Sequence, residues 1–385
     1  MFDVYQEAVN LHKKNHGKLE VKSKVRLKNM KDLSLAYTPG VAEVCQVIAK
    51  DETQVSLLTL KGNTVAVVTD GSAILGLGNL GAKAALPVME GKCVLFKEFA
   101  GVNAFPICLD TQDTEEIIKT IKYLAPVFGG INLEDISAPR CFEIEERLKK
   151  ELNIPVVHDD QHGAATVVLT GLINALKLRG LSKEKAKVVV NGAGAAGLAV
   201  TKLLLKYGVQ NITVCDSKGA IYEGRPDLTG IKKELAVLTN LPCLSAGRAT
   251  NTGKLADVLQ KSDVFIGLSA PGILKAEMIR SMNEKPIIFA LANPVPEIMP
   301  DEAKKAGAFI VATGRSDFPN QMNNALVFPG LFRGALDNKV IDVTDEMFIR
   351  IAENLANLIA RPSRNRILPD IFNKKVVKTV ASAVY

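Results

Sequence analysis

An apolar strand that runs into three spaced glycines decides the fold: Lys187-Val188-Val189-Val190-Asn191-Gly192-Ala193-Gly194-Ala195-Ala196-Gly197. Residues 198–207 predict a helix, and residues 211–215 predict the next strand, which Asp216 closes. The order strand, G-x-G-x-x-G, helix, strand, acid is typical of a Rossmann unit. Its glycines allow a tight turn and let backbone amides approach a pyrophosphate at the start of the helix. We therefore expect a dinucleotide site on Gly192, Ala193, Gly194, Ala195, Ala196 and Gly197.

Asp216 bears on which dinucleotide binds. It lies about 20 residues beyond the glycines, where a carboxylate accepts hydrogen bonds from the adenosine ribose. A carboxylate there favours NAD because it repels the 2′-phosphate of NADP, but Lys218 and Arg225 lie nearby in the sequence and leave NADP open. The alternative interpretation is that the glycines serve only close packing of the helix on the strand.

Two pairs of adjacent acids follow two other short apolar runs. Glu134-Asp135 follows residues 131–133, and Asp159-Asp160 follows residues 154–157. Carboxylates at the ends of neighbouring strands are the oxygen ligands that a hard divalent cation needs. Adjacent side chains on extended backbone point to opposite sides, so Asp159 and Asp160 should have different tasks. Taken singly, each pair has a plainer interpretation as a helix cap or as solvated surface acids.

The first part of the chain alternates strands and helices. Strands are expected at residues 64–69 and 105–109, and helices from Asp113 onward and over residues 138–152. This alternation predicts a parallel α/β domain with both acidic pairs at the ligand-binding edge of its sheet. Further helices are expected at residues 164–177, 344–360 and 369–383. The fold class is α/β, with an N-terminal α/β domain (1–160), a doubly wound Rossmann-type dinucleotide-binding domain (161–345) and C-terminal helices packed on both (346–385).

Two residues are candidates for proton transfer. Tyr37 precedes the rigid turn Thr38-Pro39-Gly40, where a phenol either packs or, with a lowered pKa, acts as a general acid. Lys92 stands at the start of an apolar run, where burial would lower its pKa and make it a usable base, unless it snorkels to the surface. A second glycine-rich stretch, residues 76–81, could line a ligand cleft.

Composition limits the classes of function. The 385 residues are too many for one ordinary core, and 47% of them are hydrophobic. We expect no membrane span, because no apolar run is long enough. The cysteines at 45, 93, 108, 141, 215 and 243 are scattered, which suits a reducing cytoplasm. The net charge of +7 suits anionic substrates, and the absence of Trp and of a nucleic-acid-reading motif argues against a nucleic acid partner.

Taken together, these motifs resemble those of a malic enzyme of the short bacterial type, over nearly the whole chain. The resemblance implies oxidative decarboxylation of malate to pyruvate and CO₂, with NAD or NADP and with Mg²⁺ or Mn²⁺. The motifs that carry it are Tyr37-Thr38-Pro39-Gly40, Thr69-Asp70-Gly71 through Gly81, Glu90-Gly91-Lys92, Glu134-Asp135, His158-Asp159-Asp160-Gln161-His162-Gly163, Gly192 to Gly197, Ala292-Asn293-Pro294 and Asn323-Asn324-Ala325.

The resemblance also implies a role for each group. The metal would be held by Glu134, Asp135 and Asp160. An acid–base pair would be formed by Tyr37 and Lys92, with support from Asp159. The substrate and the nicotinamide would be contacted by Asn293 and Asn324. A homodimer is also implied, and a helix expected at residues 2–12 would pack on the partner or cap its own domain.

Two other classes of function remain open at this stage. One is a dehydrogenase that acts on another hydroxy or amino acid without decarboxylation, and it would not need a divalent ion. The other is an NAD-sensing protein without catalysis, which would need only the second domain. The joint presence of Tyr37, Lys92 and the acidic pairs argues against the sensor.

Overall fold

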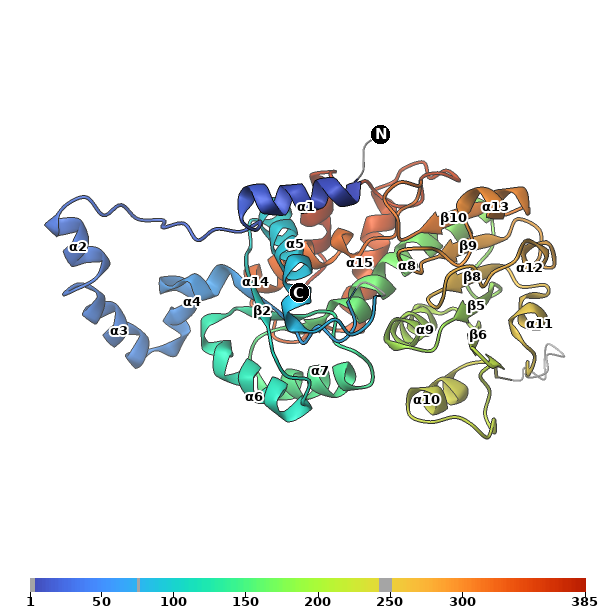
Figure 1. Cartoon of the computed structure of the whole chain (residues 1–385), viewed down its shortest axis with the longest axis horizontal. Helices are drawn as coiled ribbons and strands as arrows, with labels where there is room; N and C mark the ends of the chain where they lie inside the picture. The colour runs from blue at the N-terminus through green and yellow to red at the C-terminus, as the bar shows by residue number, and fades with distance from the viewer. Residues whose placement is uncertain (1–3, 75–76, 242–250) are drawn as a thin grey trace.

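The computed structural model describes residues 4–74, 77–241 and 251–385 (Figure 1). Residues 2 and 3 of the expected N-terminal helix, Gly76 of the second glycine-rich stretch and Cys243 lie outside these ranges. The chain forms two parallel sheets, each with its own helices, which confirms the α/β class. Over the described ranges, none of the helices combines the length and the apolar character that a membrane span requires.

The first sheet has the strand order β2-β1-β3-β4 and is parallel throughout. β1 is buried along its whole length, and its side chains alternate between two helical layers. Val65 and Val67 pack with α5, whereas Ala66 and Val68 pack with α6 and α7. The elements are β1 (Thr64–Thr69), α5 (Ala82–Ala100), β2 (Asn103–Cys108), α6 (Thr114–Leu124), β3 (Gly130–Leu133), α7 (Arg140–Glu151) and β4 (Val156–His158).

A glycine-rich turn leads from β1 into α5. Leu80 and Gly81 both donate their backbone N–H to the carbonyl of Gly71. A Cβ on Gly71 would lie 2.4 Å from the Gly81 backbone, so the close approach requires glycine. This turn sets the position of α5, the helix that carries Lys92.

The second sheet has the order β10-β9-β8-β5-β6-β7, and only the short β7 is antiparallel. β5 has β6 on one side and β8 on the other, so the strand order reverses at β5, where Rossmann sheets bind their ligand. The strands are β5 (Lys187–Asn191), β6 (Asn211–Asp216), β7 (Gly219–Ala220), β8 (Val264–Gly267), β9 (Ile287–Ala290) and β10 (Ile310–Thr313).

Helices cover both faces of the second sheet. One face packs with α8 and α9, and the other packs with α11, α12 and α13. The helices are α8 (Asp159–Arg179), α9 (Ala195–Tyr207), α10 (Ile231–Leu238), α11 (Leu255–Leu259), α12 (Ala276–Arg280) and α13 (Pro300–Lys305).

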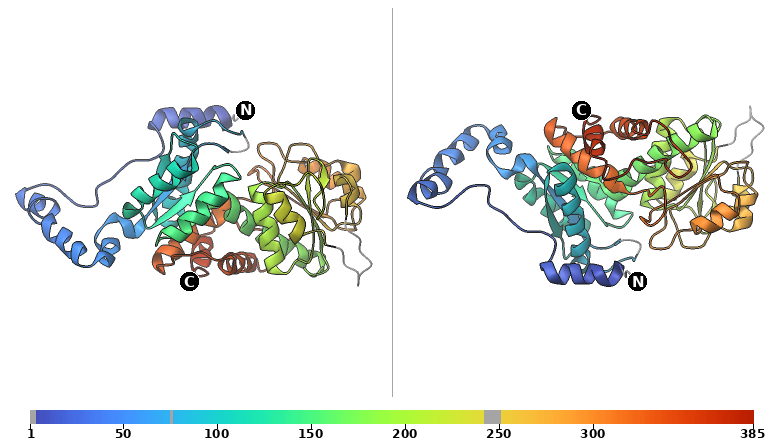
Figure 2. Two further views of the ribbon diagram at one scale, coloured as in Figure 1. Left: turned by 90° about the horizontal axis from the view of Figure 1, so that it is seen from below. Right: turned by 90° about the horizontal axis from the view of Figure 1, so that it is seen from above.

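The C-terminal helices pack on elements of both halves (Figure 2). Phe328 of α14 packs on Phe96 of α5 with ring centroids 4.9 Å apart, and α15 lies along α8. α14 therefore belongs spatially with the first sheet, although its residues precede 345. These helices are α14 (Phe328–Asp337), α15 (Asp345–Asn357) and α16 (Lys375–Ala381).

Residues 19–58 form an N-terminal arm that projects from the body in all three views (Figures 1 and 2). The helices up to this point, α1 (Val4–Asn15), α2 (Met30–Ala36), α3 (Val41–Lys50) and α4 (Val55–Leu58), contain no buried residue. The turn that follows α1 is tied to α5, because Lys18 donates to the Glu90 carboxylate and to the Pro87 carbonyl.

The starts of two helices differ most from the sequence-based expectation. α8 begins at Asp159 rather than at Ala164, because the two acids themselves form its first turn, where the helix dipole favours negative charge. The side chains of Asp159 and Asp160 therefore point in directions about 100° apart around the helix axis, rather than to the opposite faces of a strand. The last helix begins only at Lys375, whose N–H is capped by the Asn373 side chain.

Candidate active site

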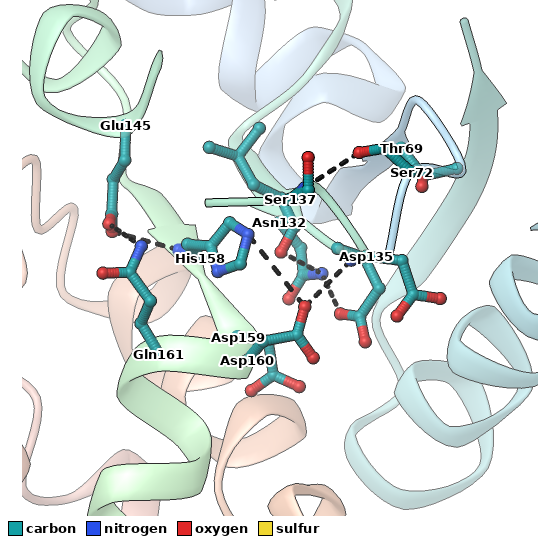
Figure 3. Close-up of polar contacts among 12 residues, drawn as sticks. Thr69, Ser72, Asn132, Asp135, Ser137, Glu145, His158, Asp159, Asp160 and Gln161 are labelled. Carbon is teal, nitrogen blue, oxygen red and sulfur yellow. Dashed lines mark hydrogen bonds and ion pairs between the residues drawn. The ribbon is translucent and has the colours of Figure 1, made fainter. Parts of the chain in front are cut away.

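The acids that follow β3 and β4 meet at one edge of the first sheet. β3 and β4 are parallel neighbours, so Glu134 and Asp135 end up beside the first turn of α8. Oxygen atoms of Glu134, Asp135 and Asp160 all lie within 4.8 Å of one another. Asp135 donates its backbone N–H to the Asp160 carboxylate at 2.9 Å, which fixes the relative position of the two acids (Figure 3).

Lys92 lies against this cluster, although α5 is far away in sequence. Its Nζ is 2.5 Å from Asp159 Oδ2 and 2.8 Å from Glu134 Oε1, and it sits 4.1 Å from the centre of the Phe328 ring. Burial alone would lower the pKa of Lys92, but the charges of the surrounding acids outweigh it and raise that pKa. The expected lowering of the lysine pKa by burial is therefore wrong, because its neighbours are carboxylates.

The arrangement of these acids fits a hard divalent cation. Burial raises the pKa of Glu134 well above its ordinary value; Lys92 opposes this, and Asp160, Asp159 and Asp135 add to it. Three carboxylates whose oxygens converge are the ligand set that Mg²⁺ or Mn²⁺ takes. A bound cation would offset the mutual repulsion of these acids.

The glycine loop of the second domain has the geometry expected of a dinucleotide site. Gly192 has φ 128°, and a Cβ on it would lie 2.3 Å from the Leu268 carbonyl oxygen. A Cβ on Gly197 would lie 1.9 Å from the Gly192 carbonyl oxygen, so this glycine allows close packing of α9. A Cβ on Gly194 would have open space around it, so a ligand can approach the backbone there, next to Ala193 and the first helical residues Ala195 and Ala196.

Asp216 ends β6, as expected, but it is engaged within the chain. Both of its oxygens accept hydrogen bonds from Arg225, and Oδ2 also accepts from Lys232. Burial works against ionisation, yet these hydrogen bonds hold the pKa of Asp216 well below its ordinary value. The side chain is only 6% exposed.

Two family models match the chain. The malic enzyme N-terminal domain matches residues 16–149, and the malic enzyme NAD binding domain matches residues 161–385. The chain belongs to the malic enzyme family. Its second domain is the NAD-binding domain of that family, and its glycine loop lies in this domain.

Relatives that are named NAD-dependent and relatives that are named NADP-dependent both match the chain. It is 59% identical to the bifunctional malic/malolactic enzyme of Bacillus subtilis, covering 98% of this chain and 92% of that one. It is 51% identical to the NADP-dependent malic enzyme of Rhizobium meliloti, covering 92% of this chain and 46% of that longer one. The crystal structure of the NAD-dependent malic enzyme of Thermotoga maritima superposes with a TM-score of 0.94 at 48% identity, covering 100% of this chain and 99% of that one.

Tyr37 does not meet Lys92 within one chain. It caps the C-terminal end of α2 on the N-terminal arm, whereas Lys92 lies on α5 in the body of the malic domain (Figure 1). Its side chain is exposed, and so are Leu35 and Val41 beside it. The acid–base pair implied by the resemblance is therefore not assembled in a single copy.

The two amides expected at the site have different positions. Asn324 reaches Asp159 and donates to its Oδ2 at 2.5 Å, so the second half of the chain contributes directly to the acidic site. Asn293 follows β9, and its amide lies against Gly314 at the end of β10. Asn293 thus lies on the side of the second sheet, beside the carboxyl ends of β9 and β10.

Sequence reasoning missed the buried acid Glu145 on α7. It accepts from the His158 backbone at 3.0 Å and from Gln161 at 3.1 Å (Figure 3). It also accepts from His162 at 2.9 Å. Burial opposes its ionisation, but the histidines lower the pKa of Glu145 to about 2. Glu145 therefore fixes the junction of β4 and α8 from the side of α7. The sequence offered one signal for it, an acid at a core-facing position of α7 beside Ile144 and Leu148.

A second missed residue is Glu297, which is fully buried. Its two oxygens accept the backbone N–H groups of Ser269 and Ala292, at 2.9 and 3.0 Å. It thus links the loops that follow β8 and β9, the second of which carries Asn293. Burial raises the pKa of Glu297.

Proposed function

We propose that this chain catalyses oxidative decarboxylation of malate to pyruvate and CO₂, with reduction of NAD or NADP and with dependence on a divalent metal. One observation carries the proposal: Lys92 contacts Glu134 of the three-acid cluster and Asp159 beside it, and Asn324 of the second half reaches that same Asp159. These contacts support the proposal, because they bring the three acids, the lysine and the nucleotide-binding half of the chain together.

Glu134, Asp135 and Asp160 would hold the metal ion. When bound, Mg²⁺ or Mn²⁺ supplies Lewis-acid polarisation of the hydroxy acid and stabilises negative charge that develops as CO₂ leaves. The backbone contact from Asp135 to Asp160 and the side-chain contact from Asn132 to Glu134 at 3.0 Å keep the ligands oriented.

Lys92 and Asp159 would manage the hydroxyl proton. Lys92 accepts the proton of the C2 hydroxyl, and Asp159 orients the ammonium with help from Asn324. A cation on Glu134 compensates one of the charges that raise the lysine pKa, so the base becomes easier to deprotonate when the metal is present.

We propose that Tyr37 acts as the general acid at C3 in the site of a second copy, within a homodimer. The N-terminal arm carries exposed apolar side chains on its helices, among them Leu35, Val44 and Leu57, and an apolar surface of this kind favours a protein contact. Because a twofold axis makes the exchange mutual, each copy would complete the site of the other.

A mixed dimer tests the assignment of Tyr37. Copies with Tyr37→Phe and copies with Lys92→Ala are co-expressed with different affinity tags, and the mixed dimer is purified. If Tyr37 acts across the interface, one of its two sites is intact, and activity returns to about half that of the wild type. An inactive mixed dimer would place Tyr37 and Lys92 in the same chain's site and overturn this assignment.

The reaction itself is tested by following NADH or NADPH and pyruvate together, with malate and with or without Mn²⁺. We expect equal amounts of reduced cofactor and pyruvate, and a loss of both in excess chelator. Reduced cofactor without pyruvate, or full activity in chelator, would contradict the proposal. We place the enzyme in the cytoplasm, since the free thiols at Cys45, Cys93, Cys108, Cys141 and Cys215 suit a reducing compartment.

A further inference from the structure

The carboxylate at the end of β6 is already saturated with hydrogen bonds. Asp216 accepts from the backbone N–H of Lys218 at 2.9 Å, from two nitrogens of Arg225 at 3.1 and 2.6 Å, and from Lys232 at 2.6 Å. An ionised carboxylate offers about four lone-pair sites. A ribose hydroxyl could therefore be accepted by Asp216 only if one of these donors were displaced.

Arg225 is equally committed within the chain. Its Nε donates to Asp227 at 2.7 Å, and its Nη1 donates to the carbonyl of Ala220 at 2.9 Å in addition to Asp216. The guanidinium is only 8% exposed. Arg225 thus links the turn after β6 to its strand and is not available to a ligand.

The two lysines of this network are the accessible groups. Lys232 on α10 is 36% exposed, and Lys218 in the turn after β6 is 67% exposed. An ammonium has three N–H donors, and each lysine gives one to a carboxylate, Asp216 for Lys232 and Asp227 for Lys218. The network holds three cations and two carboxylates, so this strand end carries a surplus positive charge.

We propose that the cofactor site accepts an adenosine ribose that carries a 2′-phosphate, with Lys232 and Lys218 contacting the phosphate and Asp216 holding Lys232 in place. NADP would then bind at least as tightly as NAD. A ribose hydroxyl needs an acceptor that is used up here, whereas a phosphate needs the exposed ammonium groups that are present. The inference deepens the proposed function, on whose dinucleotide it rests.

The affinities of NADPH and NADH, measured by the fluorescence of the reduced nicotinamide, provide the test. No malate or metal is added, so the result is independent of whether the chain decarboxylates malate. We expect NADPH to bind at least as tightly as NADH and with a steeper salt dependence, because its phosphate makes the additional ionic contacts.

Substitution of the lysines locates the contact. Lys232→Gln and Lys218→Gln should each weaken NADPH about tenfold, since a charge-assisted hydrogen bond is lost, and leave NADH within about twofold. The matched control is Lys233→Gln, an exposed neighbour on the same helix, which should change neither affinity. Asp216→Asn should leave NADH within about twofold, whereas a direct ribose contact would weaken NADH about tenfold.

Three results would overturn the inference. One is NADH binding tenfold or more tighter than NADPH to the unaltered chain. Another is an equal effect, or no effect, of both lysine substitutions on the two nucleotides. The third is a selective loss of NADH in Asp216→Asn, which would return the carboxylate to the ribose.

Discussion

Two buried groups of carboxylates in this molecule behave in opposite ways. At the edge of the first sheet, Glu134 is surrounded by other acids and one lysine, and its pKa is raised. At the end of β6, Asp216 is surrounded by cationic groups, and its pKa is lowered. Both carboxylates follow a strand and both side chains are largely buried, and burial acts to raise the pKa of each. The hydrogen bonds and charges of the neighbours outweigh burial at Asp216 but not at Glu134.

The difference lies in the balance of charged neighbours. Where carboxylates outnumber cations, the folded chain carries repulsion that a metal ion can relieve, and the acids are available as ligands. Where donors fill every lone pair of the acid, the acid is a structural group, and we propose that the exposed cations around it contact the ligand instead. On the two proposals above, carboxylates that follow parallel strands would therefore lie beside ligands of opposite charge.

The largest expected effect comes from removing the single lysine of the acid-rich site. Lys92→Ala should lower kcat for malate oxidation by roughly 10²- to 10⁴-fold, the usual range for loss of a general base. The affinity for NADH should hardly change, because the glycine loop is untouched. Steady-state kinetics and NADH fluorescence check both halves of the prediction.

Lys97→Ala is the matched control for this change. Lys97 lies on the same helix but contacts Asn103 at the surface, so the variant should keep normal turnover. Near-normal kcat in Lys92→Ala would remove this lysine from the role of base.

Removal of one acid from the cluster should abolish metal binding without lowering the stability of the metal-free chain. Mn²⁺ at about 100 times its Kd should raise the melting temperature of the unaltered chain by roughly 5 °C, because it binds only the folded state. Asp135→Asn should abolish that rise and leave the stability without metal equal or higher, since Asp135 adds to the repulsion at Glu134. Thermal unfolding with and without Mn²⁺ measures this.

The exposed acid Glu143 on α7 offers the control, and Glu143→Gln should retain the full Mn²⁺ effect. If Asp135→Asn also retained the rise in melting temperature with Mn²⁺, the cation would be bound at another site.

At the end of β6, removal of the acid should change the stability in the opposite direction. Asp216→Ala should destabilise the fold by about 2 to 3 kcal/mol, because it leaves Arg225 without its bidentate partner. Because the pKa of Asp216 is lowered in the folded state, its carboxylate stabilises the fold fully at any pH above its unfolded-state pKa of about 3.8. This stabilisation is lost only as the pH falls through the lower pKa of the folded state. Denaturant unfolding at pH 7 therefore shows the whole effect.

An increase in stability for Asp216→Ala would break the comparison, since the site would then be acid-rich like the other. The exposed acid Glu223, in the loop before α10, is the control, and Glu223→Ala should change stability little.

The smallest effect concerns Glu297, an acid whose hydrogen-bond donors are neutral groups. Glu297→Gln leaves one of the backbone amides of Ser269 and Ala292 facing an NH₂ group, which should cost about 1 kcal/mol of stability. If the loop that carries Asn293 shifts as a result, the same free energy corresponds to a roughly fivefold decrease in kcat. KM for the dinucleotide should stay within about twofold. A change in KM with kcat intact would instead place Glu297 in the support of cofactor binding.

The sequence predicted the parts of the site that depend on local backbone geometry. The spaced glycines after β5 require close approach wherever they occur, and Gly192 and Gly197 meet that requirement in the structure. The acids after β3 and β4 were predicted to converge because parallel strands share one edge, and the three oxygens do converge.

The charge state and the partners of those groups could not be predicted. Lys92 lies between carboxylates that come from two other elements, so its pKa rises where burial alone predicted a fall. Asp159 and Asp160 have separate partners because a helix begins at the first of them, and Asn324 arrives from η5 (Asn324–Leu326) near the other end of the chain.

By itself, the sequence determined the α/β fold and the two kinds of strand end, because strand periodicity, glycine spacing and helix caps act over a few neighbouring residues. Only the tertiary structure decided which acid faces a cation and which is already satisfied, and that Tyr37 lies on an arm away from its own lysine. Electrostatic interactions depend on distance through space, and residues 37, 92, 134, 216 and 324 acquire their distances only when the whole chain is folded.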